Sequence, residues 1–188
     1  MTSHYIDIRV LPDPETGPTQ LLGALYDRLH LALVQHGLGN IGVSFPDYSQ
    51  NPRALGNRLR LHAGEQALQS FLQSDWLKGM RDHVRIDNIA KAPADAPHRT
   101  MQRRQYKTNV ERLRRRRMKR KGETAEQAKA AIPHTVERRP DLPYIHLHSR
   151  STGQPFHLFI ALGPPQPLPM AGPFNSHGLS TSTTVPWF

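Results

Sequence analysis

Residues 5–10 read YIDIRV, and apolar side chains alternate with polar ones along this stretch. This alternation is typical of a β-strand with one buried face. Further along the chain, the pattern predicts helices at about 21–33 and 68–76 and strands at 41–45, 58–62 and 83–89. The order strand, helix, strand, strand, helix, strand predicts a ferredoxin-like α+β domain, in which two helices cover one face of an antiparallel sheet.

The proline-rich stretch APADAP at 92–97 is typical of a linker. We therefore expect one domain at 1–95 and a C-terminal α+β domain at 96–188. Thr108 and Glu111 have the spacing of a capping box, which predicts an arginine-rich helix at about 109–121. The remaining predicted elements are a short helix that begins after Thr124 and ends before Pro133, and strands at 144–151 and 155–162.

Positive charge is concentrated in one segment of the chain. The 188 residues contain 25 Lys and Arg against 15 Asp and Glu, a net charge of +10. Between Arg99 and Lys121 there are 12 basic residues and one acidic residue, whereas the rest of the chain has 13 basic and 14 acidic residues. Such a concentration indicates a polyanionic partner. Nucleic acid is favoured over a disordered basic tail or a membrane-surface helix, because the segment lies mid-chain and lacks a wide apolar face.

Several classes of protein are excluded or made improbable by what the sequence lacks. It has no cysteine, which excludes disulfide scaffolds, zinc ribbons, iron–sulfur clusters and thiol catalysis. No apolar run approaches the ~20 residues of a membrane span, and the first residues do not resemble a secretory signal. We expect a soluble cytoplasmic protein that does not associate with a membrane.

Two short motifs are weak indications of a cofactor or metal. Gly37, Gly39 and Gly42 match GxGxxG, but a helix precedes the motif and a strand follows it, the reverse of the order in a dinucleotide-binding site. His146 and His148 share one face of a predicted strand, yet no third ligand accompanies them. We therefore expect neither a cofactor nor a metal.

The predicted arginine-rich helix is suited to RNA. About 13 helical residues span roughly 20 Å, and basic side chains recur along it at intervals of three and four residues, which gives them a shared broad face: Arg112, Arg115, Arg116, Lys119 and Arg120. Arg103 and Gln105 could pair with guanine and adenine, or could be solvated loop residues. The deep major groove of long duplex RNA excludes side chains, so a short hairpin is the more compatible partner. No local pattern reveals an active site.

Motifs along nearly the whole chain resemble the type I-F CRISPR repeat-processing endoribonuclease family. The stretches that carry the resemblance are HYIDIR at 4–9, RLHLALV at 28–34, IGVSFPD at 41–47, LGNRLRLH at 55–62, WLKGMRDH at 76–83, NVERLRRRRMKRK at 109–121, IPHTV at 132–136, DLPYIHLHSRSTGQPFHLFI at 141–160, GLS at 178–180 and VPWF at 185–188. The resemblance implies metal-independent cleavage of precursor CRISPR RNA at the 3′ base of a repeat hairpin, by attack of a ribose 2′-hydroxyl that leaves a 2′,3′-cyclic phosphate.

The resemblance also implies which residues form the catalytic site. The family's catalytic histidine and serine fall on His30 and Ser149, and a second serine near the scissile phosphate falls on Ser151. His177 stands where the family commonly has a tyrosine that helps orient the catalytic histidine. An imidazole there could replace the hydrogen bond of the tyrosine or take part in proton transfer.

The RNA-binding residues follow by the same resemblance. The base-reading residues correspond to Arg103 and Gln105, and the aromatic platform beneath the closing base pair corresponds to Phe156. The basic residues inserted into the groove correspond to Arg115, Arg116, Lys119 and Arg120, with Lys119 in place of the usual arginine. The resemblance further implies single-turnover cleavage, retention of the mature CRISPR RNA hairpin and assembly with the other subunits of a surveillance complex. A non-catalytic hairpin-binding subunit and a general basic RNA-binding protein are the alternative functions.

Overall fold

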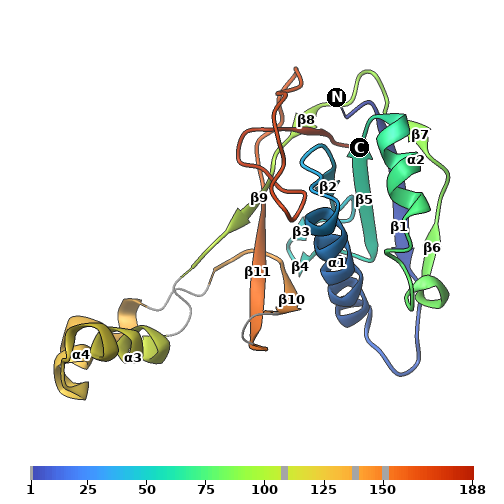
Figure 1. Ribbon diagram of the computed structural model, residues 1–188. Coiled ribbons are helices and arrows are strands. Elements are labelled where there is room, and N and C mark those ends of the chain that lie inside the picture. The colour runs from blue at the N-terminus through green and yellow to red at the C-terminus, as the bar shows by residue number, and fades with distance from the viewer. Residues whose placement is uncertain (1, 107–109, 137–139, 150–152) are drawn as a thin grey trace. The chain divides into compact units, whose positions relative to one another are not determined.

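The computed structural model describes residues 2–106, 110–136, 140–149 and 153–188, and the chain forms two compact units (Figure 1). Residues 1–104 together with 142–188 make up the larger unit, and 105–141 make up the smaller one. The final segment of the chain therefore belongs to the same unit as the N-terminal sheet, whereas the arginine-rich helix belongs to the other unit.

The main sheet of the larger unit has the predicted βαββαβ topology. Its strands are β1 (His4–Val10), β2 (Gly42–Ser44), β5 (Arg58–Ala63) and β6 (Val84–Ile86), in the order β2-β5-β1-β6 with antiparallel neighbours. Because β1 and β2 flank β5, they are parallel to each other, and α1 (Pro18–Gln35) connects them. In the same way α2 (Glu65–Gln73) lies on the connection between β5 and β6. The prediction of an α+β fold with this arrangement is confirmed.

Two details of this unit differ from the sequence prediction. Helix α1 begins at Pro18 after the N-cap Gly17, three residues before the predicted start at about 21, and proline suits the first helical position because its missing N–H would be unsatisfied there. The strand predicted at 83–89 is instead the 3₁₀ helix η1 (Arg81–His83), β6 and β7 (Ala90–Lys91). Both strands pair with β1, but three residues separate them where the facing stretch of β1 has two. The additional residue interrupts the ladder, as in a β-bulge.

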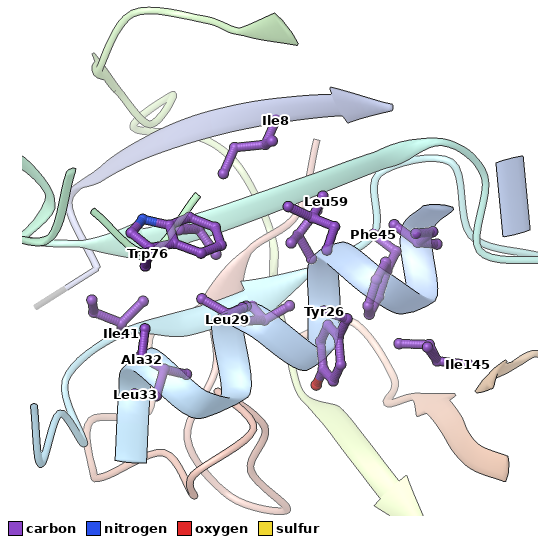
Figure 2. Close-up of a cluster of buried hydrophobic side chains, with 14 of the residues drawn as sticks. Ile8, Tyr26, Leu29, Ala32, Leu33, Ile41, Phe45, Leu59, Trp76 and Ile145 are labelled. Carbon is purple, nitrogen blue, oxygen red and sulfur yellow. The ribbon is translucent and has the colours of Figure 1, made fainter. Parts of the chain in front are cut away.

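The core lies between the main sheet and its helices. Ile8 of β1 and Leu59 of β5 are direct cross-strand neighbours and are fully buried. Leu29 of α1, Phe45 and Trp76 belong to the same cluster (Figure 2). The apolar spacing of 21–33 therefore predicted the buried side of α1 correctly.

The opposite face of the main sheet is also covered, although YIDIRV predicted only one buried face. Asp7 and Arg60 face each other across β1 and β5, and the Arg60 guanidinium donates two hydrogen bonds of 2.6 and 2.9 Å to the Asp7 carboxylate. The centroid of the Phe188 ring lies 3.9 Å from the Arg60 guanidinium carbon. The backbone oxygen of Phe188 accepts a further hydrogen bond of 2.9 Å from this guanidinium. The end of the chain thus encloses an ion pair that the alternating pattern alone would leave in solvent.

A second antiparallel sheet of the larger unit has the order β10-β11-β9, with β10 (Tyr144–His148), β11 (Pro155–Leu162) and β9 (Met101–Arg104). The strand predicted at 155–162 is confirmed as β11, and the one predicted at 144–151 is present as β10 but ends at His148. Strand β9 was not predicted. Helix α1 packs on β10 so closely that a Cβ on Gly23 would lie 2.7 Å from the His146 carbonyl oxygen. The remaining pairs are β3 (Ser49–Gln50) with β4 (Arg53–Ala54) and β8 (His98–Arg99) with β12 (Val185–Pro186).

The smaller unit contains α3 (Val110–Lys121), α4 (Ala125–Ala131) and the 3₁₀ helix η2 (His134–Val136). The short helix predicted after Thr124 is confirmed as α4. It begins with a capping box, since the backbone N–H of Gln127 donates to the Thr124 hydroxyl and the backbone N–H of Thr124 donates to the Gln127 side chain. Thr108, the predicted cap of α3, lies outside the described residues. Among the described helices, none is both long and apolar enough to cross a membrane.

Candidate functional site

Two histidines from distant parts of the chain form a stacked pair in the larger unit. His30 lies on α1, and His177 lies in the loop that follows Phe174. Their ring centroids are 3.9 Å apart and the ring planes are inclined by 19°. The structure therefore brings together the predicted catalytic histidine and the residue that stands at the family's tyrosine position.

A hydrogen bond sets the tautomer of His30. Its Nδ1 atom lies 2.7 Å from the carbonyl oxygen of Ser176. A carbonyl oxygen can only accept, so Nδ1 must carry a proton and donate it. In the neutral ring the lone pair is then on Nε2, which leaves that atom able to accept a proton. Neighbouring Leu29 is fully buried, whereas His30 is half-buried at the edge of the same helical face.

The loop that carries His177 is held by its own side chains and by the core. The side-chain oxygen of Asn175 accepts hydrogen bonds from the backbone N–H groups of His177 (2.9 Å) and Leu179 (3.1 Å). Gly178 between them has a φ of +70°, a left-handed conformation that glycine adopts without strain. From α1, the buried hydroxyl of Tyr26 donates to the His177 carbonyl at 2.7 Å.

His177 is neutral at physiological pH. Burial, followed by repulsion from a protonated His30 and from Arg103, lowers its pKa from 6.5 to about 3. The side chain is only 8% exposed. Because the ring of His177 is neutral, it does not repel His30 when His30 takes up a proton. Near pH 7, His177 is not an imidazolium and so cannot donate a proton as one.

Arg103 acts on His177 through its charge. It lies on β9 opposite the fully buried Ile160 of β11, so its half-buried side chain leaves the sheet on the inner face. Its charge lowers the pKa of His177. Of the residues predicted by resemblance, the structure brings His30 and His177 into contact, and the charge of Arg103 acts on His177.

Ser149 follows directly after β10, the strand on which α1 packs. Its backbone continues the hairpin, because its N–H donates to the Gln154 carbonyl at 2.8 Å and its carbonyl accepts from the Gly153 N–H at 2.6 Å. Phe156 of β11 pairs with Leu147 of β10 and is half-buried against the core. Ser151 lies outside the described residues.

The smaller unit displays most of its basic side chains. Arg114 is buried and donates to the Ile132 carbonyl at 2.9 Å and to Glu111 at 2.6 Å, and Arg117 forms two hydrogen bonds with Glu123. These two arginines fix α3 to its own unit. The residues predicted to bind RNA on this helix are all exposed: Arg112, Arg115, Arg116, Lys119 and Arg120. Gln105 is exposed as well.

The sequence analysis missed Tyr26, Asn175 and Ser176. Tyr26 belongs to the apolar pattern of α1 and gave no sign of its hydroxyl contact. Asn175 and Ser176 lie in a proline- and glycine-rich region, where the identity of the backbone partners depends on the tertiary fold. Over the described ranges, no group of three or more His, Asp or Glu side chains could hold a metal ion. His146 and His148, the predicted weak metal pair, lie in β10.

Comparison with known proteins identifies the family of the chain. Residues 5–188 match a family model described as CRISPR-associated protein (Cas_Csy4). A protein of Pseudomonas aeruginosa (strain UCBPP-PA14), named CRISPR-associated endonuclease Cas6/Csy4, is 48% identical over 185 residues, which cover 98% of this chain and 99% of that protein. A protein of the same name from Escherichia coli (strain UTI89 / UPEC) is 43% identical over the same shares of the two chains. The chain therefore belongs to the Cas_Csy4 family of CRISPR-associated proteins.

Proposed function

We propose that this protein is a metal-independent endoribonuclease that binds the hairpin of a CRISPR repeat and cuts the precursor RNA at the 3′ base of the stem. The observation that carries the proposal is the His30 ring, whose Nδ1 donates to the Ser176 carbonyl while Nε2 remains available as a base. The two relatives, which are 48% and 43% identical and are both named endonucleases, support the same reaction class.

The reaction requires one proton acceptor and one aligned nucleophile. His30 Nε2 removes the proton of the ribose 2′-hydroxyl, typically worth ~10²–10⁴ in rate. The 2′-oxygen then forms a bond to the adjacent phosphorus, and the bond from phosphorus to the 5′-oxygen breaks. The products are a 2′,3′-cyclic phosphate and a 5′-hydroxyl, whose oxygen takes up a proton from solvent or from protonated His30. RNA supplies the nucleophile and His30 supplies the base, so the step needs no metal-bound water.

Ser149 is suited to hold the ribose in line rather than to attack. The attacking oxygen belongs to the RNA, and the gain from a serine hydroxyl here is in orientation. Its position at the end of β10, on which α1 packs, supports a role beside His30. We assign Ser151 a second contact to the scissile phosphate, and Phe156 stacking beneath the closing base pair.

Helix α3 binds the hairpin stem. Its 12 residues span about 18 Å, and the exposed side chains Arg112, Arg115, Arg116, Lys119 and Arg120 supply phosphate contacts. Arg103 and Gln105 contact base edges, where guanidinium suits guanine and amide suits adenine. Because the stem stays bound after the cut, cleavage is single-turnover, and the protein remains on the mature CRISPR RNA as a subunit of the surveillance complex.

A non-catalytic hairpin-binding subunit is the alternative, and one observation favours it. His177 replaces the family's usual tyrosine and is held neutral by burial, so it contributes neither a phenolic hydroxyl nor a charged imidazolium. The experiment that distinguishes the two functions incubates the protein with its repeat RNA in EDTA. The proposal predicts one cut with a 2′,3′-cyclic phosphate end, and no cut in an RNA with 2′-deoxyribose upstream of the scissile phosphate. Tight binding without any cut would establish the alternative, and loss of the cut only in EDTA would contradict the metal-independent mechanism.

A further inference from the structure

We propose that the outward face of the β10–β11 hairpin, together with Arg104 of β9, is a second RNA-contacting surface that stacks unpaired nucleotides flanking the repeat hairpin. We call this set of side chains the outer aromatic face: Tyr144, His146, His148, His157, Phe159 and Arg104. The inference rests on the proposed function, since it assumes that the protein binds RNA, but it concerns a surface to which no role has been given above.

The strand register separates this surface from the core. Along β10, Ile145 and Leu147 are buried, whereas Tyr144, His146 and His148 alternate with them and are exposed. Cross-strand neighbours share a face of an antiparallel sheet. Tyr144 therefore shares its face with Phe159, and His146 shares its face with His157.

The rings of this face contact one another. Tyr144 and His157 are stacked, with ring centroids 4.4 Å apart and planes inclined by 29°. His146 meets His157 edge-on at 4.4 Å, and Phe159 lies 5.5 Å from Tyr144 and only 6% exposed. Mutual packing limits the rotamers of these rings. When a nucleobase stacks on Tyr144 or His157, the ring therefore loses little side-chain entropy.

The charge of the face suits a polyanion. Arg104 is exposed and pairs with Phe159 across β9 and β11, which places its guanidinium on the outward side. None of the residues that β9, β10 and β11 direct outward is acidic: Gln102, Arg104, Tyr144, His146, His148, Pro155, His157, Phe159 and Ala161. Exposed aromatic rings on a sheet, beside a guanidinium and without carboxylates, are the means by which proteins bind single-stranded RNA.

The outer aromatic face is distinct from the surface assigned to the hairpin stem. Phe156, the proposed platform for the closing base pair, pairs with Leu147 and so belongs to the inner face with the core. Arg103 likewise leaves β9 on the inner side, opposite Ile160. Adjacent residues of the same strands therefore serve the stem on one side and the flanking single strand on the other.

The test compares the affinities of hairpins with and without single-stranded extensions. The RNA carries 2′-deoxyribose at the cut site so that it stays intact, and it is used bare, with six uridines on its 5′ side, or with six uridines on its 3′ side. For wild-type protein at least one extension should tighten binding about tenfold or more, as expected for stacked bases. In the double variant Tyr144→Ala/His157→Ala the gain should fall below about threefold, while affinity for the bare hairpin should stay within about twofold of wild type.

Two further variants control for folding and for loss of apolar surface in general. Tyr144→Phe keeps the ring and should keep the gain. Leu168→Ala removes a side chain that is 71% exposed in another part of the unit and should also keep the gain. The inference is overturned if neither extension tightens binding to the wild type, or if the double variant gains as much as the wild type does. Failure of the proposed function is a separate result, because it would appear as weak binding of the bare hairpin.

Discussion

The Nδ1 atom of His30 lies 2.7 Å from the carbonyl oxygen of Ser176, which joins the middle of α1 to a loop 146 positions later in the chain. This one contact fixes the ring orientation, the tautomer and the atom that can act as base. The stacked ring of His177 and the Tyr26 hydroxyl bond hold the same loop.

Replacing His177 by tyrosine should reduce the acid sensitivity of the fold. The pKa of His177 is about 3 in the folded protein and near 6.5 when unfolded. Between these values the unfolded chain binds the additional proton, so the unfolding free energy falls as the pH is lowered below about 6.5, by about 2 kcal/mol at pH 5. His177→Tyr removes this term, and cleavage should stay within about tenfold of wild type because the ring and the backbone contacts remain.

Thermal unfolding of both proteins at pH 7.5 and pH 5.0 measures this effect. His62 is also buried, and burial lowers its pKa well below the usual value, so the wild type retains other acid-sensitive groups. The relevant quantity is therefore the difference between the two proteins in their loss of stability. An equal loss in wild type and variant would show that His177 is not held neutral by its surroundings.

Asn175→Ala should lower the cleavage rate by about tenfold or more without a matching loss of RNA affinity. The substitution removes the acceptor for the N–H groups of His177 and Leu179, each bond worth about 0.5–1.5 kcal/mol, and frees the loop that positions Ser176 and His177. Asn175→Asp keeps an acceptor at the same place and should restore most of the rate. The measurements are single-turnover cleavage and hairpin affinity for both variants. Equal cleavage rates for the aspartate and alanine variants would contradict this role.

Gly23→Ala should destabilise the larger unit by about 1–3 kcal/mol. Alanine normally favours a helix over glycine by about 1 kcal/mol, but here the added Cβ would lie 2.7 Å from the His146 carbonyl oxygen. Moving α1 away from β10 should also separate His30 from the serine hairpin and slow cleavage. Gly39→Ala is the matched control, since its Cβ would make only ordinary contacts, the nearest at 3.5 Å. Denaturant unfolding of the two variants decides the matter, and equal stability would contradict the close approach.

Arg115→Ala and Arg116→Ala should each weaken hairpin binding and reduce the slope of log affinity against log salt concentration by about one. Both side chains are exposed on α3, so their loss leaves the packing of the helix intact. Arg85→Ala removes an exposed arginine of the other unit and should leave the slope unchanged. An unchanged slope in all three variants would exclude α3 as the source of the phosphate contacts.

The patterns that predicted the fold were those that depend on neighbouring residues. Alternation in YIDIRV and the leucine spacing of α1 report which face of an element is buried, and both were correct. Burial of the polar face of β1 was not predictable in this way, because Asp7 is satisfied by Arg60 and enclosed by Phe188, far along the chain. The same holds for β9, whose residues are too few and too polar to show a strand pattern.

Residue types indicated the candidate RNA-binding helix but not the candidate catalytic site. The exposure of Arg115 and Arg116 follows from their spacing, and the anchoring role of Arg114 does not, because it depends on the Ile132 carbonyl of the next helix. His30 was identified only by resemblance to a family. What makes it suitable as a base is a backbone carbonyl, and the sequence carries no sign of where a backbone carbonyl will lie.

The most direct test of the central claim is the single-turnover cleavage rate of repeat RNA by His30→Ala in EDTA. It is measured together with hairpin affinity, and His36→Ala, at the C-cap of the same helix, is the control. The proposed mechanism predicts that His30→Ala slows cleavage by at least ~10² and changes the affinity by less than about threefold, whereas His36→Ala leaves both near wild type. Cleavage by His30→Ala at the wild-type rate would show that another group is the base, and a collapse of affinity would show that His30 has a structural role.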